Sequence, residues 1–202
     1  MSKKTVFIAS APPLILASGS PYRRSLLERL QQPFEVIQAE VDETVRPGET
    51  PEAAVRRLSR AKSEAVAARL DDGLVIGSDQ LASLRGAALG KPGTLERARR
   101  QLAELSGQSV DFLTGLTLTH ARTGQQNEAL VVTRVRFRVL SDPEILRYLQ
   151  QEAAFDCAGS FKCEGFGITL VESIETDDPT ALIGLPLISL VALLKEQGLP
   201  LP

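Results

Sequence analysis

The sequence predicts an α/β fold built on a mixed sheet, and three observations support this class. Short apolar runs of strand length alternate with longer segments in which apolar residues recur at helical spacing. Residues that favour helix N-caps stand at the start of several of the longer segments. Residues 110–120 and 129–140 read as two long strands joined by a turn at Arg122-Thr123-Gly124. Alternating strands and helices with one long hairpin therefore point to a mixed sheet.

The first elements are a strand over residues 14–17 and a helix that begins near Pro21. The strand is predicted from its unbroken apolar run, and proline suits the first turn of a helix. Residues 34–37 form a second strand, and residues 39–49 form a polar, acidic loop. Ser18-Gly19-Ser20 lies in the strand-to-helix turn, a position that ligand-binding loops often occupy.

A long helix is expected over residues 51–70, because a threonine N-cap and a proline precede alanines at helical spacing. Lys62 lies midway along it. Residues 74–77 are a candidate for a buried strand, which delivers Ser78-Asp79-Gln80 at its end. A second apolar run follows over residues 81–84.

Gly90-Lys91-Pro92-Gly93 is expected to form a tight loop, and Thr94 caps a helix that extends to about Leu105. In the second hairpin strand apolar and basic residues alternate, which predicts one packed face and one basic, solvated face. The inward set is Val135, Phe137 and Val139, and the outward set is Arg134, Arg136 and Arg138.

Ser141-Asp142-Pro143-Glu144 is a capping box that opens another helix. A glycine-rich stretch follows over residues 158–167, then a strand over residues 168–171. An apolar helix over residues 186–196 ends the fold.

The composition fits one well-buried domain or two lobes that share a cleft, with 202 residues, 43% hydrophobic and 24% charged. The net charge of −2 gives no overall attraction to nucleic acid or to anionic membranes, so any anionic ligand must be held by local cations. The longest apolar stretches are interrupted and too short for a transmembrane helix. Residues 1–12 are interpreted as a short extension, with a signal peptide as the alternative.

Histidine and cysteine chemistry is largely excluded. His120, the single histidine, ends a hairpin strand beside a turn, where a surface role is expected. Cys157 and Cys163 can build neither a disulfide framework nor a zinc motif, and are expected to be reduced thiols. The candidate chemistry then moves to carboxylates, lysines and hydroxyls, which suit a phosphate site with Mg²⁺ or Mn²⁺ rather than zinc.

Two groups near the N-terminus could bind phosphate. Ser18-Gly19-Ser20 offers hydroxyls and backbone N–H groups at a helix N-terminus, although this sequence is also ordinary turn chemistry. Arg23 and Arg24 oppose the helix dipole, which a polyanionic ligand would compensate; two solvated arginines are the alternative.

Asp79 and Lys91 are further candidates. A carboxylate after a strand is a common catalytic or metal-binding position in α/β proteins, with a turn cap as the alternative. Lys91 lies between Gly90 and Pro92, which could aim its ammonium at a phosphate, although a plain turn lysine is more common. Asp42 and Glu43 could meet a cation, or simply be solvated. Arg134, Arg136 and Arg138, the arginine stripe, could contact phosphates or a partner subunit, but a solvated strand face is expected.

Taken in order, five motifs resemble the Maf family of nucleoside triphosphate pyrophosphatases. They are Leu16-Ala17-Ser18-Gly19-Ser20-Pro21-Tyr22-Arg23-Arg24, Arg60-Ala61-Lys62, Ile76-Gly77-Ser78-Asp79, Gly90-Lys91-Pro92 and Ala158-Gly159-Ser160-Phe161. The resemblance covers nearly the whole chain and implies a single Maf-like domain over residues 13–202. It further implies an elongated Maf/ITPase-like fold, with flanking helices and two lobes around a central cleft, in a cytoplasmic protein that is often a homodimer.

The resemblance also implies residue roles. Family members convert nucleoside triphosphates to the monophosphate and pyrophosphate with a divalent metal. Carried over by motif, Asp79 is the proton acceptor and acts with Lys62 and Lys91. Glu43 and Asp79 are the metal-site candidates. The substrate-binding candidates are Ser18, Ser20, Arg23 and Arg24.

Tyr22, Gln80 and Glu164 match the branch that acts on 7-methyl-GTP, whereas the dTTP/UTP branch typically has Arg, Thr and Gln at these positions. A physical hypothesis accompanies the match. N7 methylation makes guanine cationic, so Tyr22 would stack on it and Glu164 would accept hydrogen bonds from the guanine N1–H and amino edge.

Three other functions stay open at this point. The first is the same chemistry on dTTP, UTP or modified pyrimidine triphosphates. The second is a nucleotide-binding regulator of septum formation or division arrest in which hydrolysis is incidental. The third is a nucleic-acid-binding module, which only the arginine stripe supports and the acidic charge balance opposes.

Overall fold

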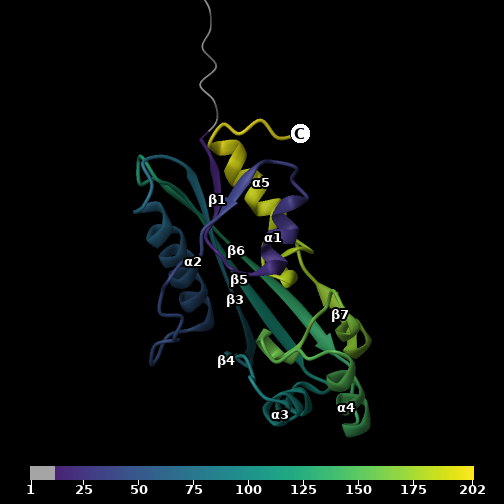
Figure 1. Ribbon diagram of the computed structural model, residues 1–202. Coiled ribbons are helices and arrows are strands. Elements are labelled where there is room, and N and C mark those ends of the chain that lie inside the picture. Colours follow the sequence, from purple (N-terminus) through teal and green to yellow (C-terminus); the bar gives the residue numbers. More distant parts are fainter. Residues whose placement is uncertain (1–11) are drawn as a thin grey trace, which may run out of the picture.

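A computed structural model describes residues 12–202, and it contains one mixed sheet of seven strands (Figure 1). The order is β2-β1-β3-β5-β6-β7, and β4 pairs with β3 beside this path. β1 is parallel to β2 and β3, and the other pairs are antiparallel. The strands are β1 (Leu14–Leu16), β2 (Phe34–Val36), β3 (Leu74–Leu84), β4 (Ala87–Leu89), β5 (Ser109–His120), β6 (Gln126–Phe137) and β7 (Val171–Glu175). The α/β class with a mixed sheet is confirmed.

Helices flank the sheet, and several begin at the predicted caps. The Thr50 hydroxyl accepts a hydrogen bond from the Ala53 N–H, and both halves of the Ser141/Glu144 capping box are present. The α-helices are α1 (Pro21–Glu28), α2 (Pro51–Ala67), α3 (Leu95–Leu105), α4 (Asp142–Gln151) and α5 (Leu187–Glu196). The 3₁₀ turns are η1 (Ala158–Ser160), η2 (Phe166–Leu170) and η3 (Ala181–Ile183).

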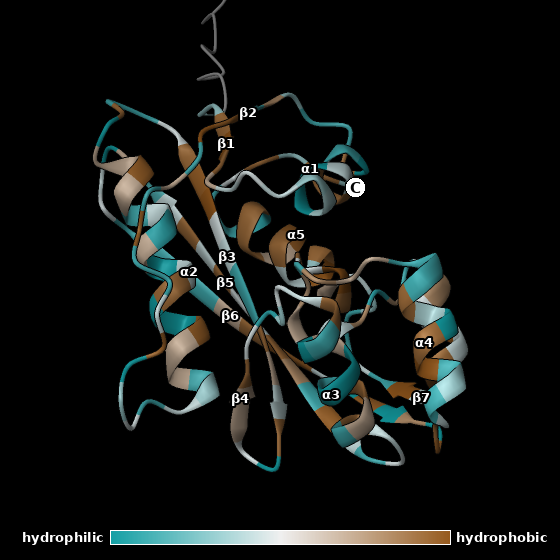
Figure 2. Ribbon diagram, turned by 60° about the horizontal axis from the view of Figure 1, so that its bottom comes forward, coloured by the Kyte–Doolittle hydropathy of each residue, from teal (hydrophilic) through white to brown (hydrophobic). Residues whose placement is uncertain are grey.

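The sheet is covered on both faces near its parallel strands. Figure 1 shows α2 on one side of the long strands and α1 with α5 on the other. Alternation along the first strand explains this arrangement, because Leu14 and Leu16 pack with the leucines of α1 and α5, whereas Ile15 and Ala17 pack with α2. Figure 2 shows α5 as largely hydrophobic, in keeping with its burial against this face.

Two apolar clusters define two lobes. One gathers α1 and α5 over β1, β3 and β5, and includes Leu26, Leu116 and Leu190. The other lies under α3 and α4 at the far ends of β5 and β6, and includes Leu102 and Phe137. The long strands β3, β5 and β6 pass through both lobes, so a continuous sheet joins them.

The structure corrects the prediction for β3. Residues 74–77 and 81–84 were predicted as separate runs with Asp79 at the end of the first, but they belong to one strand. Ser78-Asp79-Gln80 continues the ladder, with Asp79 opposite Gly115. The polar triplet does not end the strand, because β5 satisfies its backbone and long-range partners satisfy its side chains.

The prediction after the capping-box helix also needs correction. Residues 168–171 were expected to form a strand, but residues 166–170 form η2 and the strand begins at Val171. Val139 was expected inside and is 83% exposed, because β6 ends at Phe137 after an irregularity in register. The short strand β4 was not predicted.

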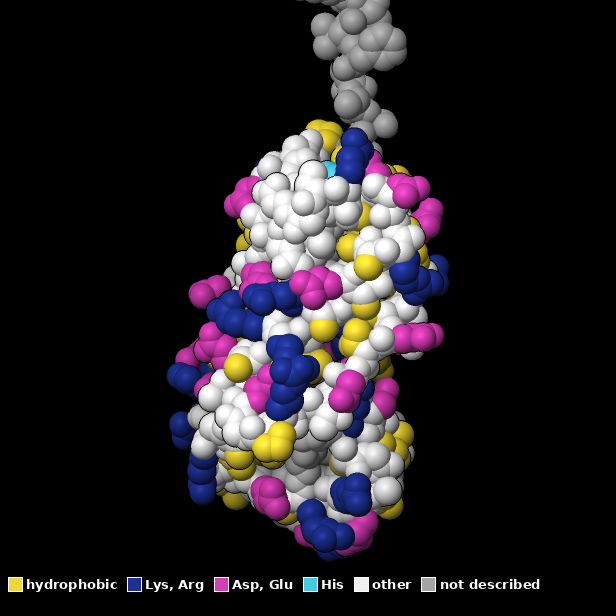
Figure 3. Space-filling model, turned by 90° about the vertical axis from the view of Figure 1, so that its left-hand side faces the viewer, with side chains coloured by type: hydrophobic (Ala, Val, Ile, Leu, Met, Phe, Trp, Pro, Cys, Tyr) yellow, Lys and Arg dark blue, Asp and Glu magenta, His cyan; other side chains and the backbone are white. Residues whose placement is uncertain are grey.

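The arginine stripe on β6 and directly after it is paired with carboxylates. Arg134, Arg136 and Arg138 contact Asp111, Glu172 and Glu144, at 2.9, 2.9 and 3.4 Å respectively. Over α2, Figure 3 shows charges of both signs interspersed rather than a surface of one sign. These ion pairs agree with the expected solvated strand face.

Two expectations concern the ends of the chain and membranes. The predicted N-terminal extension, residues 1–12, lies outside the described residues except for Pro12. None of the helices within residues 12–202 combines the length and the apolar character needed to cross a bilayer.

Candidate active site

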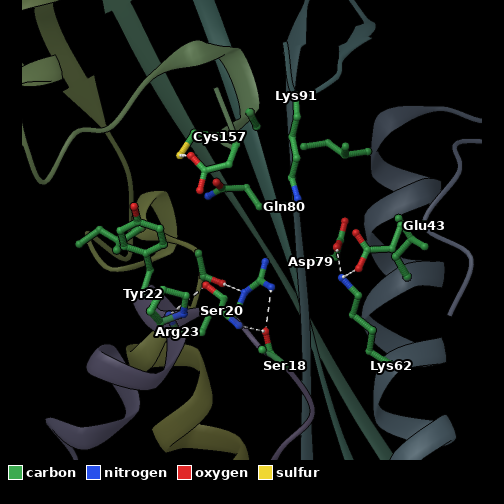
Figure 4. Close-up of a pocket in the computed structure, with 18 of the residues that line it drawn as sticks. Ser18, Ser20, Tyr22, Arg23, Glu43, Lys62, Asp79, Gln80, Lys91 and Cys157 are labelled. Carbon is green, nitrogen blue, oxygen red and sulfur yellow. Dashed lines mark hydrogen bonds and ion pairs between the residues drawn. The ribbon is translucent and has the colours of Figure 1, made fainter. Parts of the chain in front are cut away.

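A cavity of about 680 Å³ lies between the two lobes, and most of the predicted site residues line it (Figure 4). Its walls come from the β1–α1 turn, the loop after β2, the middle of β3, α2, the loop before α3, residues 156–164 and residues 182–184. Ser18, Ser20, Tyr22, Arg23, Glu43, Lys62, Asp79, Gln80, Lys91 and Glu164 all line this cavity.

Glycines let α2 approach the sheet closely, and this approach brings Lys62 to the cavity. A Cβ atom at Gly115 would lie 2.6 Å from the Val55 carbonyl oxygen, and one at Gly77 would collide with the Ser59 carbonyl oxygen. Only glycine leaves room for the α2 backbone at these points. The neighbouring face of α2 is consequently buried.

Hydroxyl pairs fix the rotation of α2 on the sheet. Ser59 Oγ lies 3.0 Å from Thr117 Oγ1, and Ser63 Oγ lies 2.8 Å from Thr119 Oγ1. Both pairs are buried, so each hydroxyl would lose a hydrogen bond if the helix turned. The side chain between these serines, Lys62, is thereby aimed at the sheet.

Lys62 joins two carboxylates from different elements. Its Nζ lies 2.6 Å from Asp79 Oδ1 and 2.8 Å from Glu43 Oε1, as Figure 4 shows. Lys62 and Asp79 are buried, and the Glu43 side chain is half exposed. Burial acts to raise the pKa of the Glu43 carboxyl, but the hydrogen bond and charge of Lys62, with the charges of Lys91 and Arg23, lower it.

The loop that carries Glu43 is tied to α2. Arg57 donates to Glu49 Oε1 at 2.6 Å and to the Thr44 carbonyl oxygen at 3.0 Å. The hydrogen bond from Arg57 lowers the pKa of Glu49 to about 2. This anchor holds Glu43 within reach of Lys62.

The start of α1 forms a second polar cluster. Ser20 is the N-cap of α1, its N–H donates to Ser18 Oγ at 3.2 Å, and a guanidinium nitrogen of Arg23 donates to the same oxygen at 3.3 Å. Arg23 Nε donates to the Gly184 carbonyl oxygen at 2.8 Å. Burial lowers the pKa of Arg23, and the charges of Asp79 and Glu43 oppose this shift. The guanidinium therefore faces the same space as the carboxylates.

Gln80 and Lys91 complete the walls around Asp79. The Gln80 amide nitrogen donates to the carbonyl oxygens of Ala181 and Leu182, at 2.8 and 3.1 Å, and so secures the segment that leads to Gly184. Figure 4 shows Lys91 extending into the cavity from the opposite side to Ser18. Its positive charge helps to lower the pKa of the Glu43 carboxyl.

The remaining wall is formed around Tyr22. Asp156, Cys157 and Glu164 line the cavity with it, and Lys162 Nζ lies 5.7 Å from the centre of the Tyr22 ring. Both cysteines are free, and burial raises the pKa of the Cys157 thiol to about 12. Cys157 thus contributes a neutral surface and no nucleophile.

Three predicted or considered residues lie elsewhere. Arg24 does not line the cavity, because its guanidinium projects to the surface and pairs with Glu28 at 3.2 Å. Asp42 also lies outside the lining and caps its own loop, accepting from the Thr44 N–H at 2.9 Å. His120 is remote from the cavity, and its Nδ1 is buried without a hydrogen-bond partner among the described residues.

Sequence reasoning missed several residues of the site. Gln38 and Asp156 line the cavity, Gly184 accepts from Arg23, and Lys162 lies over Tyr22. The available signal for Asp156 and Lys162 was their position directly beside or within the glycine-rich stretch. Gly184 gave no local signal, because its partner is far away in sequence.

The carboxylate pair fits a hard divalent cation held jointly with a ligand. Carboxylate oxygens of Glu43 and Asp79 both pair with the Lys62 ammonium and so lie close together. Within residues 12–202 there is no group of three or more His, Cys, Asp or Glu side chains that could hold a metal ion. Mg²⁺ is commonly held by one or two carboxylates, with waters and substrate phosphates as the other ligands. The donor set therefore suits a cation that arrives with a phosphate.

Comparisons with known proteins agree with this chemistry. The profile of the Maf family, described as Maf-like protein, matches residues 13–197. The chain is 55% identical over 191 residues to a protein named 7-methyl-GTP pyrophosphatase from Xanthomonas axonopodis pv. citri, covering 95% of this chain and 100% of that relative. Proteins with the same name are 54% identical in Burkholderia thailandensis (96% and 91% covered) and 53% identical in Pseudomonas aeruginosa (95% and 100% covered).

Proposed function

The chain belongs to the Maf family, and we propose that it is a nucleoside triphosphate pyrophosphatase that hydrolyses 7-methyl-GTP to 7-methyl-GMP and pyrophosphate. One observation carries the proposal. At one end of the cavity, Arg23, Lys62 and Lys91 lie around the same space as Asp79 and Glu43. Tyr22 lies at the other end (Figure 4). Such a cavity suits a ligand with a polyphosphate at one end and an aromatic base at the other.

The reaction that we propose is attack of water on the α-phosphorus. The water oxygen forms a bond to phosphorus, and the bond from the α-phosphorus to the oxygen bridging to the β-phosphorus breaks. Lys62 holds Asp79 Oδ1 at 2.6 Å, and we assign Oδ2 to accept the proton that the water loses. The pyrophosphate leaves with the electron pair of the broken bond.

The cations stabilise the charge that develops on the leaving group. Lys62 and Arg23 are both fixed by other contacts, so they are oriented before the substrate arrives. Lys91 comes from a loop on the opposite wall, and Ser18 and Ser20 add hydroxyls at the start of α1. Arg24 has no part in this scheme.

A divalent cation, Mg²⁺ or Mn²⁺, would be held by Glu43 and Asp79, where it would neutralise phosphate oxygens and lower the pKa of a bound water. The ion pairs of Lys62 with Glu43 and Asp79 already bring the two carboxylates together.

Recognition of the base is assigned to the other end of the cavity. We propose that Tyr22 stacks on the purine and that Glu164 accepts hydrogen bonds from its N1–H and amino edge. Gln80 contributes indirectly, because its amide fixes the segment that precedes Gly184. We further propose that the protein acts in the cytoplasm to remove modified or noncognate nucleotides; a homodimer stays a prediction for light scattering to test.

The test is a pyrophosphate-release assay with 7-methyl-GTP, GTP, dTTP and UTP, with Mg²⁺ or Mn²⁺ and after chelation. We expect metal-dependent release that favours 7-methyl-GTP, and a loss of about a hundredfold or more in Asp79→Asn, because the amide cannot accept the proton. Asp71→Asn removes an exposed carboxylate outside the cavity and is the matched control. Activity confined to dTTP and UTP would overturn the substrate assignment, and inactivity on all four would favour the regulatory alternative.

A further inference from the structure

The charged side chains of the cavity are sorted by sign. Around Asp79 three cations meet two carboxylates, namely Arg23, Lys62 and Lys91 with Glu43 and Asp79. The other charged lining residues are Asp156 and Glu164, both carboxylates, and Asp156 shares the Lys162 ammonium with the Tyr22 ring. The cavity therefore has a net positive end and a net negative end.

Lys162 lies behind the negative end. It does not line the cavity, yet its Nζ is 3.7 Å from Asp156 Oδ1 and 5.7 Å from the centre of the Tyr22 ring. One ammonium thus contacts an aromatic ring and a carboxylate that both face the ligand space. Its side chain is only 14% exposed, so its position is set by its surroundings.

The backbone around Lys162 is held by α4. The Lys162 N–H donates to Tyr148 Oη at 3.2 Å, and the Phe166 N–H donates to Glu152 Oε2 at 2.5 Å. Tyr148 is buried, and its ring stacks on that of Phe166 at 6.4 Å between centres. The Lys162 ammonium consequently has a fixed base from which it reaches Tyr22 and Asp156.

We infer that Asp156 is a specificity-determining residue that attracts a positively charged base, and that Lys162 is a positioning residue that limits this attraction. The inference rests on the proposed function and deepens it. Methylation at N7 places a positive charge on the five-membered ring of guanine, whereas the base of GTP is neutral. A carboxylate beside the base therefore favours the methylated nucleotide through charge alone, without a hydrogen bond to the methyl group.

Lys162 acts in the opposite direction by two routes. First, its ammonium neutralises part of the Asp156 charge at 3.7 Å. Second, it makes a cation–π interaction with the Tyr22 ring, which competes with the attraction of that ring for a cationic base. Removal of the Lys162 charge, with Tyr22 in its present position, should therefore strengthen the preference for a positively charged base.

Binding of the product nucleotides tests the inference without metal or turnover. Affinities for 7-methyl-GMP and GMP are measured by calorimetry in the presence of EDTA, at low and high salt. Asp156→Asn should lower the ratio of the two affinities about three- to tenfold, as expected for unit charges roughly 6 Å apart in a solvated site. The loss should fall on 7-methyl-GMP and shrink at high salt, and Asp71→Asn should leave the ratio unchanged.

Lys162→Met keeps the aliphatic stem and removes the charge. We expect it to raise the same affinity ratio about two- to fivefold, whereas a merely structural role would weaken both nucleotides alike. An unchanged ratio in Asp156→Asn would overturn the inference, as would a fall or no change in Lys162→Met. Failure of the wild-type protein to hydrolyse any triphosphate would instead refute the proposed function, and the binding ratios would still decide the role of Asp156.

Discussion

The close contact between α2 and the sheet makes Gly115→Ala a sharp test of how packing supports the site. The added methyl would lie 2.6 Å from the Val55 carbonyl oxygen and 2.9 Å from its carbon. Ordinary contact begins near 3.4 Å, so the helix must retreat by about 0.8 Å at this point. The retreat would pull Lys62 away from Asp79 and strain the hydroxyl pair of Ser59 with Thr117.

Overpacking of this kind costs about 1–3 kcal/mol, which in a domain of this size lowers Tm by about 2–12 °C. Misplacement of catalytic groups by about 1 Å can cost on the order of a hundredfold in rate, so we expect kcat/KM to fall about ten- to a hundredfold. Thermal unfolding by circular dichroism and pyrophosphate release measure the two effects.

Gly90→Ala is the control for stability, because a Cβ atom there has nothing within 4 Å and the backbone conformation is ordinary. Its Tm should match that of the wild-type protein. A Gly115→Ala variant with unchanged Tm and full activity would refute the proposed link between the glycine contact and the position of Lys62.

Two further predictions concern carboxylates outside the cavity lining that hold neighbouring segments in place. Buried Asp178 accepts hydrogen bonds from the N–H groups of Ile188 and Ser189 at the start of α5, so Asp178→Ala should cost about 2–4 kcal/mol; a fall in Tm of less than about 2 °C would contradict this assignment. Glu49, whose pKa is lowered to about 2 by Arg57, should stabilise the fold fully above its ordinary pKa of 4.5, and this contribution should vanish as the pH falls towards 2. The Tm difference between wild type and Glu49→Gln should accordingly be largest near neutral pH and disappear near pH 2, and a difference that persisted at pH 2 would exclude the ion pair as its cause.

Local signals predicted most of the secondary structure. Thr50, Thr94 and Ser141 are N-caps as predicted, because a side chain that caps a helix acts within three residues of itself. The continuity of β3 through Ser78-Asp79-Gln80 was missed, since the partners that satisfy these polar side chains come from β5 and from residues 181–184. A strand that looks interrupted in sequence is thus completed by distant residues.

The candidate site follows the same division. Ordered motifs identified the residues around Asp79, but no local pattern predicts that Lys62 joins Asp79 to Glu43, because each comes from a different element. Arg24 and Arg23 are adjacent and chemically alike, yet the turn of α1 sends only Arg23 into the cavity. The contact of Lys162 with Tyr22 likewise joins residues that lie far apart in sequence.

The continuous strands β3, β5 and β6 determine how this molecule can move. Bending one lobe against the other would distort the hydrogen bonds that pair β3 with β5 and β5 with β6 along their whole length. The sheet therefore connects the two lobes rigidly and does not serve as a hinge. Entry and exit of a nucleotide must then rely on the segments at the rim, the loop that carries Glu43, the loop that carries Lys91 and residues 156–164. Motions of such loops are faster and smaller than domain closure, so the turnover of this protein should not be limited by a large opening step.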